Sequence, residues 1–278
     1  MSAAIRLPGY QPWAAAGWRG WQASGVALDV EAWLAVAASG AGRRSRHART
    51  LRHEGGGAVY VKTWPAPGAR RARRAFAMGR ALAGAGFLAP VALLAAWRGR
   101  EGLLVTADAG GEGLADAVTA LARPDAGARR ARRALCRRLG AEVARLHEAG
   151  FVHGDLVPPN VRVRGLRFCF LDNDRTRRLP LAVGARRNLV QLGRFVAAGV
   201  TLTDRARVLA AYAAGRGLSR RARRRLGWWV VRKVTARRCT IDGIPPEVAA
   251  HAGFRRLMQP GGPFDPALGA APPPEQPA

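Results

Sequence analysis

The sequence predicts an α+β protein with a small β-rich N-terminal lobe, containing one helix, and a larger helical C-terminal lobe. Short alternating or apolar segments dominate up to about residue 108, and helical periodicity dominates after it. The chain has 278 residues, of which 49% are hydrophobic, so it is long enough for two lobes with a sizeable core. These observations fix the expected order of elements along the chain.

The N-terminal lobe is expected to be strands around a helix. The segments HARTLRH and AVYVKTW alternate around an EGGG turn at 54–57, which predicts a β-hairpin. A helix is predicted from residue 69, ended by Gly84 and Gly86, and APVALLAAWRG and EGLLVTADA are two further strands. The predicted organisation is an extension at 1–38 with a helix at 29–39, an N-lobe at 39–110, a C-lobe at 111–258 and a disordered Pro/Gly-rich tail at 259–278.

The C-terminal lobe is expected to be mostly helical. GLADAVTALA predicts a short helix, and the segment from Asp125 to Gly150 predicts a long one with Leu135, Leu139 and Val143 on one face. Two short strands, VRVRG and RFCFLD, follow. Helical patterns then resume in RRNLVQLGRFVAAG, DRARVLAAYAAG and SRRARRRLGWWVVRKVTARR.

The net charge of +28 has two interpretations that both remain open. One is an anionic partner, such as a lipid surface, a phosphorylated substrate or nucleic acid. The other is a GC-rich coding sequence, because Lys62 and Lys233 are the chain's only lysines and every other basic residue of the count is arginine. Trp18, Trp21, Trp228 and Trp229 lie among arginines, and they belong either to a membrane interface or to the core.

The three cysteines, Cys136, Cys169 and Cys239, are far apart and have apolar neighbours, so we expect buried free thiols and neither disulfides nor zinc. No apolar run reaches the roughly 18 residues of a membrane span. The N-terminus lacks the pattern of a signal peptide, and the expected location is the cytoplasm.

Polar residues gather in one otherwise apolar stretch, HGDLVPPNVRVRGLRFCFLD. Asp155 lies on a loop, Asn160 follows five positions later, and the predicted hairpin brings Asp172 back beside Asn160. Amide and carboxylate oxygens at that spacing suit Mg²⁺, which prefers oxygen ligands. Asp155 is then free to accept a proton from an attacking hydroxyl, which is the division of roles in kinase-type phosphoryl transfer.

This stretch resembles the catalytic and metal-binding segments of the protein-kinase-like superfamily. HGDLVPPN is similar to the H-x-D-L-x-x-x-N motif, and LDND stands in place of D-F-G. Lys62 in AVYVKTW resembles the strand lysine that binds ATP phosphates. Gly40 and Gly42, with Ser45 at the third position, lie where the phosphate loop would be.

Within that superfamily, FLDNDRTRR and RRNLVQLGRFV resemble the lipopolysaccharide kinase family, the Kdo/heptose kinases, over about residues 40–240. The resemblance implies a bilobal kinase fold and ATP-dependent phosphorylation of a Kdo or heptose hydroxyl of the lipopolysaccharide inner core. It also implies Mg²⁺, an anionic glycolipid acceptor and a peripheral location at the cytoplasmic face of the inner membrane. The implied site residues are Asp155 and His153 for catalysis, Lys62, Gly40 and Gly42 for ATP, and Asn160 and Asp172 for the metal.

One departure and two alternatives stay open. The helix after Lys62 carries no acid, and Ala75 stands about where the family's lysine-binding Glu is expected. A small-molecule kinase of the aminoglycoside or choline type shares HGDL, although this chain has few acids for a cationic acceptor. A kinase-fold pseudoenzyme that binds anionic partners is the other alternative; no recognised nucleic-acid motif is present, and no specific nucleic-acid partner is expected.

Overall fold

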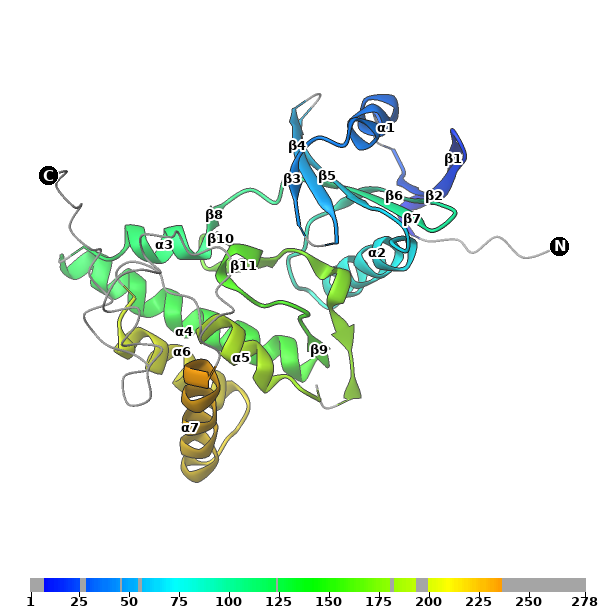
Figure 1. Cartoon of the computed structure of the whole chain (residues 1–278). Helices are drawn as coiled ribbons and strands as arrows, with labels where there is room; N and C mark the ends of the chain where they lie inside the picture. The colour runs from blue at the N-terminus through cyan, green and yellow to red at the C-terminus, as the bar shows by residue number, and fades with distance from the viewer. Residues whose placement is uncertain are drawn as a thin grey trace, which may run out of the picture. The chain divides into compact units, whose positions relative to one another are not determined.

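The computed structural model describes residues 8–25, 29–45, 47–54, 57–123, 125–180, 183–193 and 200–236. The chain forms two compact units (Figure 1). Unit 1 comprises Met1–Gly110 and Cys169–Thr176, and unit 2 comprises Gly111–Phe168 and Arg177–Ala278. A mixed fold with a β-rich N-terminal unit and a helical remainder confirms the fold class that the sequence predicts.

Unit 1 is built on an antiparallel seven-stranded sheet in the order β1-β2-β6-β7-β5-β4-β3. Its strands are β1 (Tyr10–Ala15), β2 (Trp18–Ala23), β3 (Arg43–Arg44), β4 (Arg49–Glu54), β5 (Ala58–Trp64), β6 (Ala92–Arg98) and β7 (Glu101–Ala107). Its helices are α1 (Val30–Ser39) and α2 (Ala69–Gly84). The hairpin, the two later strands and both helices therefore lie where the sequence predicts them.

The first strands differ from expectation. Residues 10–23, which the sequence analysis assigned to an extension, form the hairpin β1–β2, and β2 pairs with β6 in the main sheet. The turn between them holds Ala16 and Gly17 at positive φ. The alternating pattern of this segment is interrupted by Pro and Gly, which explains why it was not recognised as a hairpin.

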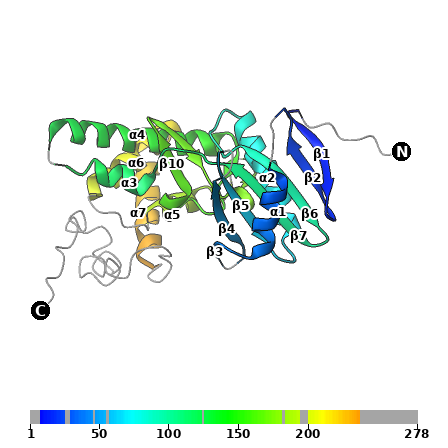
Figure 2. The ribbon, with the colours of Figure 1, turned by 90° about the horizontal axis from the view of Figure 1, so that it is seen from above.

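Helices α1 and α2 cover opposite faces of this sheet (Figure 2). On β5, Val59 and Val61 face a cluster that includes Trp33 of α1, whereas Trp64 faces a cluster with Phe76 of α2. Side chains alternate along a strand, so Lys62 points to the same side as Trp64, toward α2. The alternation AVYVKTW thus determines which face of the sheet carries the lysine.

The short segment Cys169–Thr176 belongs to unit 1 although its neighbours in sequence belong to unit 2. Cys169 forms a parallel bridge with Leu88, and the Phe170 N–H donates to the Leu88 carbonyl at 3.0 Å. The ring of Phe170 meets that of Phe87 edge to face, with centroids 6.4 Å apart. These contacts attach the segment to the residues that follow α2.

Unit 2 is mainly helical, and α4 packs closely along α6 (Figure 1). Its helices are α3 (Leu114–Ala120), α4 (Ala126–Glu148), α5 (Arg186–Gly193), α6 (Leu202–Gly215) and α7 (Arg220–Ala236), with the 3₁₀ turn η1 (Pro158–Asn160). Its strands are β8 (Glu112–Gly113), β9 (Phe151–Val152), β10 (Val161–Arg164), β12 (Arg177–Arg178) and the first half of β11 (Arg167–Phe170). Strand β10 lies between β11 and β8, and β12 pairs with β9.

The thiols of Cys136 and Cys169 are buried, as expected, and burial raises the pKa of Cys136 to about 12. Cys239 and the tail at 259–278 lie outside the described residues. Within the described ranges, the helices do not combine the length and apolar character that crossing a bilayer requires.

Candidate active site

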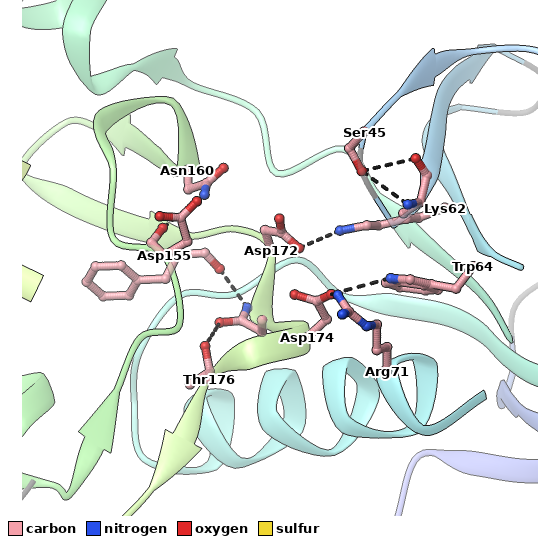
Figure 3. Close-up of polar contacts among 12 residues, drawn as sticks. Ser45, Lys62, Trp64, Arg71, Asp155, Asn160, Asp172, Asp174 and Thr176 are labelled. Atoms are coloured by element: carbon pink, nitrogen blue, oxygen red, sulfur yellow. Dashed lines mark hydrogen bonds and ion pairs between the residues drawn. The ribbon is translucent and has the colours of Figure 1, made fainter. Parts of the chain in front are cut away.

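Lys62 and Asp172 form an ion pair within unit 1. The Lys62 Nζ donates to Oδ1 of Asp172, and it also lies 4.9 Å from the centre of the Trp64 ring (Figure 3). Strand β5 positions the lysine, and the turn after β11 positions the carboxylate. The partner that the sequence left open for Lys62 is therefore the LDND loop and not helix α2.

The two aspartates of LDND lie in different environments. Asp172 has φ of 56° and a side chain that is 39% exposed, whereas the side chain of Asp174 is 6% exposed. Asp174 accepts a hydrogen bond from Trp64 Nε1 at 3.3 Å and lies 3.6 Å from Nη1 of Arg71. Burial raises the pKa of Asp174, the adjacent Asp172 raises it further, and Lys62 and Arg71 oppose the shift.

The turn that carries both aspartates is closed by the side chain of Asn173. Its Nδ2 donates to the Phe170 carbonyl at 2.9 Å, and its Oδ1 accepts from the Thr176 hydroxyl at 3.1 Å. Both contacts are buried. This short 3₁₀ turn, η2 (Asn173–Arg175), therefore holds the backbone of the acidic loop in one conformation.

Asp155 and Asn160 belong to unit 2, where the sequence predicts a loop after a short buried strand. Strand β9 ends at Val152, and η1 ends at Asn160. The Asn160 Nδ2 donates to the backbone carbonyl of Asp155 at 2.9 Å. This bond uses the amide nitrogen of Asn160, so its side-chain oxygen is the atom that would serve the metal role predicted from the sequence.

Buried side chains form hydrogen bonds to the backbone of the loop that carries Asp155. His153 is 2% exposed, and its Nδ1 accepts from the Asp155 backbone N–H at 3.1 Å. Asn188 donates to the His153 carbonyl at 2.7 Å and accepts from the His153 N–H at 3.0 Å. This geometry favours a positioning role for His153, and its assignment as a catalytic residue stays a prediction.

Gln191 reaches the same loop from helix α5. Its Oε1 accepts from the Leu156 N–H at 3.1 Å, and its Nε2 donates to the Gly154 carbonyl and to Oδ1 of Asp155. Neither Asn188 nor Gln191 was predicted from the sequence as a site residue. The signal was their spacing of three in RRNLVQLG, which places two buried polar side chains on one face of a helix.

Gly40 and Gly42 precede strand β3, and the hairpin geometry requires glycine at Gly42. Gly42 has φ of 99°, and a Cβ at this position would lie 2.6 Å from the Thr50 carbonyl oxygen. Between β3 and β4, the Ser45 hydroxyl accepts a hydrogen bond from the Ala48 N–H at 3.1 Å. The phosphate-binding roles of Gly40 and Gly42 stay predictions.

The described residues hold no cluster of three or more His, Cys, Asp or Glu side chains suited to a metal. The metal ligands predicted from the sequence are oxygen atoms of one aspartate and one asparagine. Oxygen ligands suit Mg²⁺, and one aspartate with one asparagine does not make a cluster of this kind. Lys62 and Asp172 come together in unit 1, and Asp155, His153 and Asn160 come together in unit 2.

The fold and these two residue groups define a phosphotransferase of the protein-kinase-like superfamily. The model of the lipopolysaccharide kinase (Kdo/WaaP) family matches residues 41–212. The chain belongs to this family. It is an ATP-dependent kinase that acts on an alcohol group of a sugar, as the family resemblance implied.

The solved structure of WaaP agrees with this assignment. The chain is similar to WaaP, solved in complex with acyl carrier protein, with 25% identity, a TM-score of 0.58 and coverage of 74% of this chain and 92% of that one. It also matches the aminoglycoside phosphotransferase APH(3'')-Id from Streptomyces rimosus, with 18% identity, a TM-score of 0.49 and coverage of 75% and 99%. Comparison with the curated proteins gave no match.

Proposed function

We propose that this kinase transfers the γ-phosphate of ATP to a Kdo or heptose hydroxyl of the lipopolysaccharide inner core. The observation that carries the proposal is the Lys62–Asp172 pair, which joins the two motif residues that a kinase uses at the phosphates. Family membership supports the sugar acceptor. The acceptor assay described below distinguishes a Kdo hydroxyl from a heptose hydroxyl.

Each residue has a defined task in this reaction. The acceptor oxygen attacks the γ-phosphorus, the bond from that phosphorus to the β,γ-bridging oxygen breaks, and the acceptor proton passes to Asp155. Lys62 neutralises phosphate charge, while Asn160 and Asp172 would hold Mg²⁺. When bound, the metal neutralises the charge of the β- and γ-phosphate oxygens.

Asp155→Asn tests the proposal directly. The variant keeps the shape of the loop and loses the proton acceptor, so phosphate transfer should fall at least about a hundredfold, within the range for loss of a general base. Affinity for Mg·ATP should stay within about twofold of wild type. The assay uses deacylated inner-core oligosaccharides that end in Kdo or in heptose, with aminoglycosides and choline as alternative acceptors.

Three outcomes decide between the candidates. Transfer to a core sugar that Asp155→Asn abolishes supports the proposal and identifies the sugar. Transfer to aminoglycosides or choline alone would favour the small-molecule kinase. Absence of ATP-dependent transfer to any of these acceptors, with intact binding of anions, would favour the pseudoenzyme.

The acceptor is an anionic glycolipid, and an arginine-rich groove in unit 2 suits it. The groove has a volume of about 1340 Å³ and is lined by α6, α7, the segment between them and Arg186 at the start of α5. Its lining contains no Asp or Glu, and its arginines include Arg216, Arg220, Arg221 and Arg224. We propose that this groove places the enzyme on the anionic cytoplasmic face of the inner membrane.

The tryptophans divide between the two expected roles. Trp18 and Trp21 pack against the cores of unit 1, as an ordinary structural role requires. Trp228, by contrast, is 66% exposed at the groove, and Arg186 stacks on the Trp229 ring at 4.5 Å. Only this second pair supports the membrane interface, because amphipathic rings beside cations suit the headgroup region.

The similar WaaP structure suggests a protein partner as well. That protein was solved in complex with acyl carrier protein. We propose the same partner class for this chain, and co-purification with acyl carrier protein on a sizing column tests it. Separate elution at micromolar concentrations would show that the likeness does not extend to the partner.

A further inference from the structure

Helix α2 has no acidic residue where the family's lysine-binding glutamate is expected, and Ala75 stands about at that position. The helix has no acid in its first turn, and its sequence, ARRARRAFAMGRALAG, contains no Asp or Glu. Lys62 is instead paired with Asp172. The usual contribution of this helix, a negative charge beside the strand lysine, is therefore missing.

The same helix contributes a positive charge to the acidic loop. Arg71 lies 3.6 Å from Oδ2 of Asp174, the same oxygen that accepts from Trp64 Nε1 at 3.3 Å (Figure 3). Trp64 follows Lys62 by two positions on β5 and points to the same side of the strand. One buried carboxylate thus connects α2, β5 and the loop that carries Asp172.

We propose that Arg71 positions the LDND loop, which carries Asp172, through its ion pair with Asp174. This ion pair takes the place of the missing pair between a helix glutamate and the strand lysine. In this arrangement the loop supplies the buried acid and the helix supplies the base. The inference rests on the proposed kinase function. It divides the roles of the LDND aspartates, with Asp172 for the metal and Asp174 as an anchor.

The rigidity of the turn makes this coupling effective. Asp172 and Asp174 are two residues apart, and Asn173 closes the turn between them through its bonds to Phe170 and Thr176. A shift of Asp174 therefore moves Asp172. Without Arg71, the buried carboxylate of Asp174 would keep the Trp64 N–H and lose its nearest helix cation, which is costly for a desolvated charge.

The position of α2 itself does not depend on Arg71. Ala72, Ala75 and Phe76 are buried against the sheet, and a Cβ at Gly102 of β7 would come within 2.7 Å of the Ala72 Cβ. The helix is thus held on the sheet by close packing. Substitution of Arg71 should affect the loop while leaving the fold of unit 1 intact.

The experiment measures binding of Mg·ATP by calorimetry, without any acceptor, to wild type, Arg71→Gln and Arg71→Lys. Arg70→Gln and Arg74→Gln are the matched controls, because both arginines are exposed on the same helix. We expect Arg71→Gln to weaken Mg·ATP binding about tenfold to a hundredfold, the usual effect of losing a residue that orients a metal ligand. Binding of ATP without Mg²⁺ should change less than about twofold, and Arg71→Lys should restore part of the affinity.

A double variant separates this role from a general effect. In an Asp174→Asn background, Arg71→Gln should cause little further loss, because residues that act through one contact are not additive. Additive losses, or an Arg71→Gln variant that binds like Arg70→Gln, would overturn the inference and leave the kinase function standing. A wild-type protein that binds no Mg·ATP would overturn the proposed function and, with it, this inference.

Discussion

Gln191 Nε2 donates to Oδ1 of Asp155 at 3.3 Å, so a buried side chain on helix α5 contacts the carboxylate assigned as the proton acceptor. The same amide group also binds the backbone on both sides of Asp155, at Gly154 and Leu156. Gln191 thereby sets both the path of the loop and the orientation of its carboxylate.

Replacement of Gln191 by Leu should therefore lower kcat more than it raises KM for ATP. The expected loss in kcat is about tenfold to a hundredfold, because small misplacements of a reacting group have effects of that size. Steady-state kinetics measures it, and Arg187→Gln, on the exposed face of α5, serves as the control. A rise in KM with unchanged kcat would show that Gln191 does not orient the base.

Lys62→Met should abolish turnover, because the methionine has similar length and no charge for the phosphates. Asp172→Ala should weaken binding of Mg·ATP as well as turnover, since it removes a metal ligand. Substitution of Arg74, exposed on α2, should have little effect on either quantity. Phosphate-transfer rates and nucleotide calorimetry measure these outcomes, and full turnover in Lys62→Met would disprove the role of strand β5.

The arginine groove predicts binding to anionic vesicles that weakens as salt rises. Each basic residue near such a surface contributes about 1 kcal/mol, and the effect decays over a Debye length of about 8 Å. The triple variant Arg220→Gln, Arg221→Gln and Arg224→Gln should weaken sedimentation with phosphatidylglycerol vesicles and slow transfer to a lipid-linked acceptor. Transfer to a soluble core sugar should be preserved.

A second triple variant controls for charge alone. Arg129, Arg130 and Arg133 are exposed on α4, outside the groove lining, and their replacement by Gln removes the same charge. Equal loss of vesicle binding in both variants would assign the effect to overall charge. Lack of binding at any salt concentration would support coding bias as the origin of the +28.

His147 predicts a loss of stability in acid. Burial lowers its pKa to about 4, while its ring contacts Tyr212 and Asn188 at 3.0 Å. The unfolded chain binds a proton near pH 6.5, so stability should fall as pH decreases from 6.5 through about 4, by roughly 3 kcal/mol for this group. Urea midpoints across this range measure the loss, and His147→Gln should flatten the dependence; an unchanged slope would assign it to other groups.

The sequence predicted the parts of the site that follow one another along the chain. Motif spacing assigned site roles to Lys62, Asp155, Asn160 and Asp172, because each stands in a short pattern whose chemistry is local, and these roles stay predictions. The supports of these residues come from distant segments. Asn188 lies thirty-five positions from His153, and Trp64 and Arg71 contact an aspartate more than a hundred positions away. Contacts of this kind depend on tertiary packing, which periodicity does not encode.

Helix α2 illustrates the same limit. Its lack of an acid was visible in the sequence, and the structure shows that Lys62 pairs with Asp172 of the LDND loop. The basic contact from Arg71 was not expected, because that helix is rich in arginines with similar neighbours. Arg71 differs from the exposed Arg70 and Arg74 in being half-buried and in contacting the buried Asp174.

Unit 1 is assembled from two separate stretches of chain, so one contiguous N-terminal fragment does not contain all of it. A fragment that ended at Gly110 would contain the whole seven-stranded sheet and Lys62, yet it would lack the acidic loop that pairs with the lysine. Such a fragment would also leave Phe87, Leu88 and Trp64 without their contacts to residues 169–176. Unit 1 therefore cannot be exchanged or duplicated as a module by a single cut, and a recombinant that keeps it whole must carry the chain through residue 176.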